Sequence, residues 1–215
     1  MAGDDLELRV AWEQHLGRSD TSQRWFDTVV RRHREAGRHY HGIRHVRWML
    51  RHITALESNL ADNADIADMG AVVAAAFFHD VVYDPARSDN EAASGRLADI
   101  ALGELGWEPA RRRRVTSMID ATVAHHVDDV DLDTQVLLAA DLAVLAADPA
   151  GYGDYVRAVR REYAHVTDDD WRTGRSAVLH DLLDRPHLFA PVLGLFDWEH
   201  RARANITAEL ATLHL

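Results

Sequence analysis

Two segments of the sequence are apolar on every side, and they constrain the fold more than any other feature. The first covers residues 71–78 and the second residues 136–147, where Asp141 is the single charged residue. A helix without a polar face is normally buried on all sides, so both segments predict central helices. The first leads directly into His79 and Asp80. An ionised carboxylate buried without a partner costs several kcal/mol, so Asp80 and Asp141 should each have a cation nearby, either an arginine or a metal ion.

The rest of the chain also predicts helices, because apolar residues recur at intervals of three and four and no segment has a convincing strand pattern. The predicted helices are 5–16, 20–36, 41–57, 64–80, 89–105, 110–126, 133–147, 152–165, 169–184 and 197–213. The expected fold class is all-α, a compact bundle of nine to ten helices. Since no interdomain linker or repeat is evident, residues 1–215 are expected to form one domain, with a metal-site core at about 38–147 and helices 152–213 packed on it.

The composition excludes several kinds of chemistry. The 215 residues include 24 basic and 35 acidic side chains, for a net charge of −11, so general nucleic-acid binding is not expected. The absence of cysteine excludes disulfides, thiol nucleophiles and cysteine-ligated metals, and the absence of lysine excludes a Schiff base or a P-loop lysine. The longest apolar run is too short to cross a bilayer and the N-terminus is acidic, so we expect no membrane partner and a cytoplasmic protein.

Four residues in three predicted helices have side chains that suit a divalent metal ion. They are His45, the adjacent His79 and Asp80, and Asp141. Histidine nitrogen and aspartate oxygen form a suitable ligand set where cysteine is absent. Adjacent helical residues point about 100° apart, so His79 and Asp80 can share an ion only where helices meet near their ends. The alternative is a polar core in which arginines pair with the two aspartates and the histidines are structural.

Several stretches of the chain resemble a known family. They are residues 38–46 (Arg-His-Tyr-His-Gly-Ile-Arg-His-Val), 75–84 (Ala-Ala-Phe-Phe-His-Asp-Val-Val-Tyr-Asp), 88–94 (Ser-Asp-Asn-Glu-Ala-Ala-Ser) and 199–206 (Glu-His-Arg-Ala-Arg-Ala-Asn-Ile). From about residue 25 onward the chain is similar to the HD-domain metal-dependent phosphohydrolases, and more narrowly to the bacterial group called predicted metal-dependent HD phosphohydrolases. That family holds one divalent metal with a His, a His-Asp pair and a distant Asp. The resemblance places these ligands at His45, His79, Asp80 and Asp141, and implies a chemistry rather than a substrate.

The resemblance also implies roles for residues that follow the His-Asp pair. In related hydrolases an acidic residue just beyond the pair positions or deprotonates the attacking water, which indicates Glu91, with Asp84 as a second candidate. A glutamate at a helix N-terminus can equally be there for the helix dipole. His125 and His126 are candidates for a second metal or for protonating a leaving group, since HD phosphodiesterases recruit extra histidines. A histidine pair at a helix C-terminus can also be structural.

Three residues near the first histidine are candidates for contacts with substrate. Arg38 and Arg44 suit phosphate, and His41 lies one helical turn before His45, where it either orients a ligand, touches substrate or is structural. The arginine run 111–114 is expected on a solvated face. The core is expected to include Trp25, Trp48, Trp107 and Trp171.

The expected function is hydrolysis of a phosphate ester or anhydride in a small molecule, with a nucleotide as the favoured substrate. The ligand set suits Mn²⁺, Fe²⁺, Co²⁺, Ni²⁺ or Mg²⁺ and is also compatible with Zn²⁺. Two alternatives stay open: a noncatalytic regulatory or binding module that keeps the metal as a structural pin, and a metal-free helical scaffold. A homo-oligomer is compatible with either. A second His-Asp pair, His180 and Asp181, lies on an ordinary amphipathic helix and is not expected to bind metal.

Overall fold

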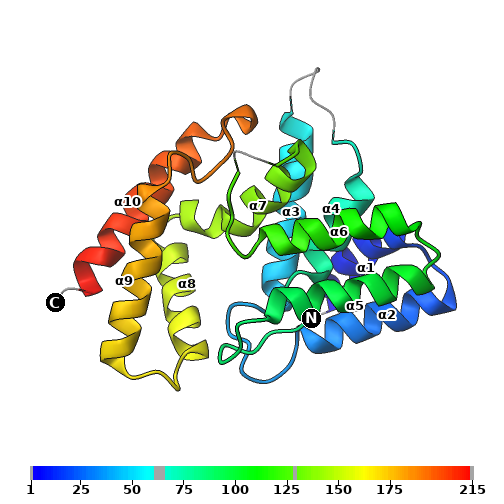
Figure 1. Ribbon diagram of the computed structural model, residues 1–215, viewed down its shortest axis with the longest axis horizontal. Coiled ribbons are helices and arrows are strands. Elements are labelled where there is room, and N and C mark those ends of the chain that lie inside the picture. The colour runs from blue at the N-terminus through cyan, green and yellow to red at the C-terminus, as the bar shows by residue number, and fades with distance from the viewer. Residues whose placement is uncertain (1, 61–65, 128–129, 214–215) are drawn as a thin grey trace.

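The chain folds as a bundle of helices, as the spacing of its apolar residues predicts. The computed structural model describes residues 2–60, 66–127 and 130–213, and within them every regular element is helical. The α-helices are α1 (Ala2–Leu16), α2 (Asp20–Arg32), α3 (Ile43–Asn59), α4 (Met69–Phe78), α5 (Asn90–Glu104), α6 (Pro109–Ala121), α7 (Leu132–Leu142), α8 (Pro149–Glu162), α9 (Asp168–Asp184) and α10 (Phe196–Leu213), and the 3₁₀ helices are η1 (Ala143–Ala146) and η2 (Pro191–Leu193). Figure 1 shows α8, α9 and α10 grouped on one side, α1 to α6 on the other, and α7 between them.

Helix α4 is buried along its whole length. All nine residues from Gly70 to Phe78 are buried, and the Phe77 and Phe78 rings lie 5.0 and 5.9 Å from the Trp12 ring of α1. Burying a phenylalanine side chain contributes about 1.5–3 kcal/mol, so the end of α4 is held firmly inside the protein. No described helix is by itself long and apolar enough to cross a membrane, although Leu132–Ala146 and Pro149–Glu162, which meet at 103°, pass a length and composition criterion as a bent pair.

Several predicted helices are longer than the observed ones. The predicted helix 20–36 ends at Arg32, and the carbonyl of the next residue, His33, accepts a hydrogen bond from Ile43 N at 3.1 Å instead of one from the following helical turn. The predicted helix 110–126 ends at Ala121, and His125 has a positive φ of 51°, which a right-handed helix does not allow. The predicted helix 64–80 begins at residue 69, after Asp68 has capped its N-terminus, and residues 64–65 lie outside the described part of the chain. The predicted helix 133–147 is α-helical as far as Leu142 and continues as η1.

Buried polar contacts fasten the last helices to the rest of the bundle. The Asn205 amide of α10 donates to the carbonyls of Leu145 and Ala147, at 2.8 and 2.9 Å, just after α7. Arg175 of α9 forms a buried ion pair with Glu209 of α10, with Nε 2.8 Å from Oε1. One hydrophobic cluster includes buried residues of helices from α1 to α10. The helices that surround the metal-site candidates therefore share a core with those that follow them.

We expect His33 to make the protein sensitive to acid. Its Nε2 lies 2.9 Å from the Phe77 carbonyl oxygen, and burial lowers the pKa of His33 to about 3, from an ordinary 6.5. Below about pH 6.5 the unfolded chain binds a proton here that the folded chain does not, so stability falls as the pH falls toward 3. Replacing His33→Gln keeps an N–H donor without this titration. Urea unfolding should show wild type losing about 3 kcal/mol more than the variant between about pH 7 and pH 4.

The matched control is His180→Gln, which removes an exposed histidine and should leave the pH dependence of wild type unchanged. Equal acid sensitivity of the His33→Gln variant and wild type would contradict this account of His33.

Candidate metal centre

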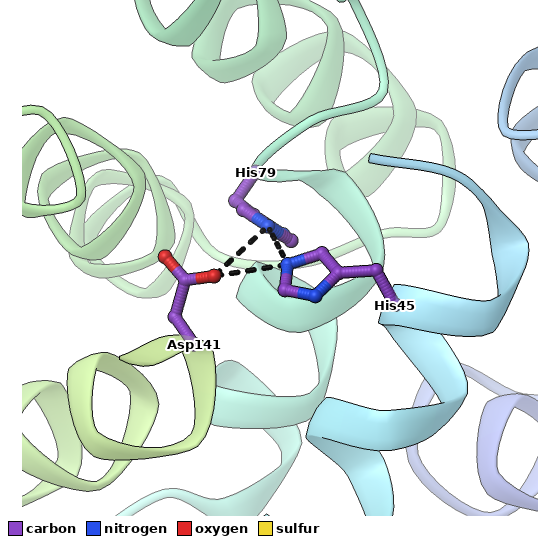
Figure 2. Close-up of side chains that lie close together, drawn as sticks. All are labelled: His45, His79 and Asp141. Carbon is purple, nitrogen blue, oxygen red and sulfur yellow. Dashed lines mark hydrogen bonds and ion pairs between the residues drawn. The ribbon is translucent and has the colours of Figure 1, made fainter. Parts of the chain in front are cut away.

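Three side chains from three helices converge at the centre of the bundle. Figure 2 shows His45 of α3, His79 at the end of α4 and Asp141 of α7 pointing toward one another. His45 Nε2 lies 3.2 Å from His79 Nε2 and 2.9 Å from Asp141 Oδ1, and the latter lies 3.8 Å from His79 Nε2. These three residues form a group whose ligand atoms all lie within 4.8 Å of one another. Neighbouring ligands of an octahedral ion with bonds of about 2.1 Å lie about 3 Å apart, so the spacing fits one divalent ion.

The hydrogen bonds of His79 favour a metal-binding tautomer. Its Nδ1 lies 3.1 Å from the carbonyl oxygen of Ala76, one turn back along α4. When Nδ1 donates its proton to this carbonyl, the lone pair of Nε2 faces His45 and Asp141. A metal-bound histidine is usually oriented by such a contact at its other nitrogen.

Asp80, the fourth predicted ligand, lies beside this group and is not a member of it. Its Oδ2 lies 3.0 Å from His79 Nε2, and the residue is 8% exposed. His79 is the C-cap of α4, so the chain has left the helix where Asp80 follows it. Both residues follow directly after the last residue of α4, and both line the same cleft.

Histidines surround the two buried carboxylates of the site. Burial alone raises the pKa of Asp80 and of Asp141, but contacts with His79, His45 and His125 outweigh burial and hold both pKa values below the ordinary range. Burial lowers the pKa of His79, yet the nearby charges of Asp80 and Asp141 raise it to about 9. In the metal-free protein a proton on His79 thus supplies the positive charge. Among the described residues no arginine forms an ion pair with either aspartate, so the alternative of buried Arg–Asp pairs does not match the structure.

A cleft of about 330 Å³ opens beside this cluster and is lined by His79, Asp80 and Asp141. Glu91, in the first turn of α5, lines the same cleft. Asp84 does not: it is exposed, and its carboxylate accepts a hydrogen bond from Ala86 N at 2.9 Å in its own loop. The structure therefore brings one of the two acidic candidates for activating water into the cleft and leaves the other outside.

The two adjacent histidines, His125 and His126, lie in different surroundings. His125 lines the cleft and its Nε2 lies 2.7 Å from Asp141 Oδ2, whereas His126 is exposed and does not line the cleft. The positive φ of His125 turns the chain at this point. The described residues contain one group of three or more histidines and acids that could hold a metal, and neither member of the pair belongs to it. His125 is placed to orient Asp141.

A buried glutamate holds the segment before α3. One carboxylate oxygen of Glu162, at the end of α8, accepts hydrogen bonds from the backbone N–H groups of His39, Tyr40 and His41, at 2.7 to 3.0 Å. The other oxygen lies 2.7 Å from His41 Nδ1 and accepts from Tyr83 Oη at 3.0 Å. Burial lowers the pKa of His41, but the hydrogen bond to Glu162 and the charge of Asp80 outweigh it, so the pKa is raised. His41 lines the cleft, and its raised pKa favours the protonated form of the ring.

Sequence reasoning missed Glu162, although one signal was available. Tyr152, Tyr155, Val159 and Glu162 follow one another at intervals of three and four, so the glutamate continues the apolar stripe of α8. A carboxylate on such a stripe is expected to be buried and therefore to have partners. Which partners it has depends on a contact across more than a hundred residues.

The two arginine candidates for substrate binding lie in different places. The Arg38 guanidinium is buried and donates to the backbone carbonyls of His41, Asp80 and Val81, so it braces the loop after α4. Arg44 is exposed and lines a separate hollow rather than the cleft. Neither guanidinium lines the cleft beside the metal ligands.

Other expectations for charged and aromatic residues were partly wrong. Three of the four arginines in the run 111–114 form ion pairs, with Asp68, Asp99 and Asp133. This side of α6 therefore carries salt bridges to neighbouring segments and is not simply solvated. Trp48 is 38% exposed rather than in the core. The second His-Asp pair is exposed on α9, and Asp181 pairs there with Arg185.

Taken together, His45, His79 and Asp141 form a group that could hold a metal ion with nitrogen and oxygen ligands, beside a cleft lined by Glu91 and His41. Comparisons of the chain with protein-family models, with curated proteins and with solved structures found no match. What the site does is therefore inferred from its own residues.

We expect Glu162→Gln to weaken both the fold and the charge of His41. In the variant, the NH₂ group of the glutamine side chain faces hydrogen-bond donors that the Glu162 carboxylate accepts from in wild type. Hydrogen bonds to a charged group contribute about 1.5–3 kcal/mol. Urea unfolding at neutral pH should therefore show a loss of about 2 kcal/mol, and NMR titration should show a lower pKa for His41. In the control Glu104→Gln the replaced side chain is exposed and accepts one hydrogen bond, from Trp25 Nε1. A His41 pKa equal in the variant and wild type would contradict the role given to Glu162.

Proposed function

We propose that this protein is a metal-dependent phosphohydrolase of the HD type. The observation that carries the proposal is the convergence of His45 Nε2, His79 Nε2 and Asp141 Oδ1, with Asp80 beside them, at the edge of an open cleft. These are the four positions that the resemblance to HD phosphohydrolases assigns to the metal. A purely structural pin would not require an open cleft lined by Glu91 and His41 beside it.

The ligand atoms suit a divalent transition metal or Mg²⁺. Two imidazole nitrogens with carboxylate oxygens favour Mn²⁺, Fe²⁺, Co²⁺ or Ni²⁺, and they are compatible with Mg²⁺ and Zn²⁺. An ion held by His45, His79, Asp80 and Asp141 would supply Lewis-acid chemistry to a phosphate ester and lower the pKa of water toward neutrality.

The remaining residues of the cleft have separate roles in the proposed hydrolysis. Glu91 orients the attacking water and accepts its proton as the water oxygen bonds to phosphorus. The His41 ring is held by Glu162, and its raised pKa favours the protonated form, which attracts the phosphate charge. His125 keeps Asp141 in place through its hydrogen bond. The bond between phosphorus and the leaving oxygen breaks, and that oxygen takes a proton from the cleft or from solvent.

We propose a nucleotide as the substrate class. A second hollow, of about 430 Å³, adjoins the cleft and shares His41 and Tyr163 with it. Its lining includes Tyr155 and Trp171, and aromatic side chains suit a flat base by stacking. A phosphate at the metal would then lie next to a site for the base.

Element analysis and a hydrolysis assay test the proposal together. Protein purified without a chelator or a metal-binding tag should contain, or take up, about one divalent ion per chain, and it should release phosphate from at least one member of a nucleotide panel with added Mn²⁺. His79→Ala and Asp80→Ala should each lose the ion and at least about a thousandfold of the hydrolysis rate. His180→Ala, in the exposed His-Asp pair, is the matched control and should keep both.

Undiminished hydrolysis by metal-depleted His79→Ala protein would contradict the proposed mechanism. Stoichiometric metal with no turnover on any nucleotide or simple phosphate ester would instead favour a noncatalytic module pinned by the ion. No metal uptake even with excess Mn²⁺ would overturn the metal centre itself.

A further inference from the structure

A third hollow lies next to the metal centre and is separate from the cleft. It has a volume of about 580 Å³, which is within the range of small-molecule sites. It lies between the start of α3 and the segment that includes η1 and α8, and no residue lines both the hollow and the cleft. We call it the arginine groove, and the residues used below are Tyr40, Arg44, His45, Trp48, Asp154, Arg157 and Arg161.

The arginine groove is positively charged in a protein that carries a net charge of −11. Its lining contains three arginines and one carboxylate, and that carboxylate, Asp154, forms an ion pair with Arg157. Arg44 and Arg161 are exposed and have no ion pair or side-chain hydrogen bond with any described residue. Two guanidinium groups are therefore available to an anion from outside the chain.

Two buried polar atoms in the wall of the groove also lack partners. His45 Nδ1 and Tyr40 Oη are both enclosed and have no hydrogen-bond partner among the described residues. The His45 side chain is 1% exposed, and its other nitrogen faces the metal site. A histidine that binds metal through Nε2 keeps its proton on Nδ1 and normally donates it to an acceptor. His79 has such an acceptor in the Ala76 carbonyl, whereas His45 has none.

We propose that the arginine groove binds a small phosphorylated anion at a site distinct from the metal centre. Phosphate oxygens match the guanidinium groups of Arg44 and Arg161, since arginine binds phosphate through paired, charge-assisted hydrogen bonds. His45 and Tyr40 both line the groove, so the bound anion would lie beside their side chains. Trp48, which is 38% exposed at the rim, offers an apolar face to the carbon part of the ligand. The ligand would thus contact the back of a metal ligand without entering the cleft.

Arginine footprinting with pyrophosphate as the probe locates this site directly. The full-length protein is treated with phenylglyoxal in EDTA, with and without inorganic pyrophosphate, and mass spectrometry gives the modification rate at each arginine. The chelator ensures that pyrophosphate cannot be held through a metal ion. Pyrophosphate should slow modification of Arg44 and Arg161 by about tenfold or more, while two exposed arginines outside the groove, Arg113 and Arg201, react as before. Equal rates at all four positions would overturn the proposal.

Paired variants test the same site by affinity. Calorimetry in EDTA should show that Arg44→Gln/Arg161→Gln binds pyrophosphate at least about a hundredfold more weakly than wild type, about tenfold for each guanidinium. The control Arg113→Gln/Arg201→Gln removes the same charge elsewhere and should bind as wild type does. All four residues are exposed, so both variants should keep the thermal unfolding temperature of wild type. Equal weakening in the two double variants would indicate a general charge effect, and no weakening in the first would place pyrophosphate elsewhere; either result contradicts the proposal.

Discussion

The carboxylates of Asp80 and Asp141 impose the requirement on which the centre of this protein depends: a positive charge must lie between them inside the bundle. In the metal-free structure histidines meet this requirement, and the neighbouring carboxylates raise the pKa of His79 to about 9. One proton is a modest counter-charge for two buried aspartates. A divalent ion supplies twice that charge and uses the same nitrogen lone pairs, so the site is expected to exchange its proton for an ion as metal becomes available.

The rest of the structure holds these groups in place. Helix α4 is buried from Gly70 to Phe78, so its end can place His79 in the interior of the bundle, beside the cleft. The segment before α3 has no regular structure of its own to fix it, and Glu162 fixes it through three backbone N–H groups. Arg38 does the same for the loop after α4 by binding carbonyls. Glu162 and Arg38 thus form hydrogen bonds with backbone groups, and both of them hold His41 at the cleft.

The sequence predicts what depends on local composition, and it fails where a partner is far away. The buried helices follow from the apolar segments, whereas the expectation that His45, His79 and Asp141 lie together comes from their metal-binding side chains and from the resemblance to a known family. The partners of Glu162 do not follow, because its contacts span more than a hundred residues. Arg38 and Arg44 look equivalent beside the first histidine, yet one precedes the start of α3 and turns inward while the other lies on the outer side of its first turn. The ends of α2 and α6 were predicted several residues too late, because the backbone leaves the helix before His33 and before His125.

The most direct test of the metal centre is a crystal structure of the protein soaked with Mn²⁺, with anomalous differences measured at a wavelength at which manganese scatters strongly. The account predicts one strong anomalous peak about 2.2 Å from His45 Nε2, His79 Nε2 and an oxygen of each of Asp80 and Asp141, with Asp141 still bound to His125. A well-ordered structure with no peak between these four residues, and His79 still paired with Asp80 through a proton, would contradict it.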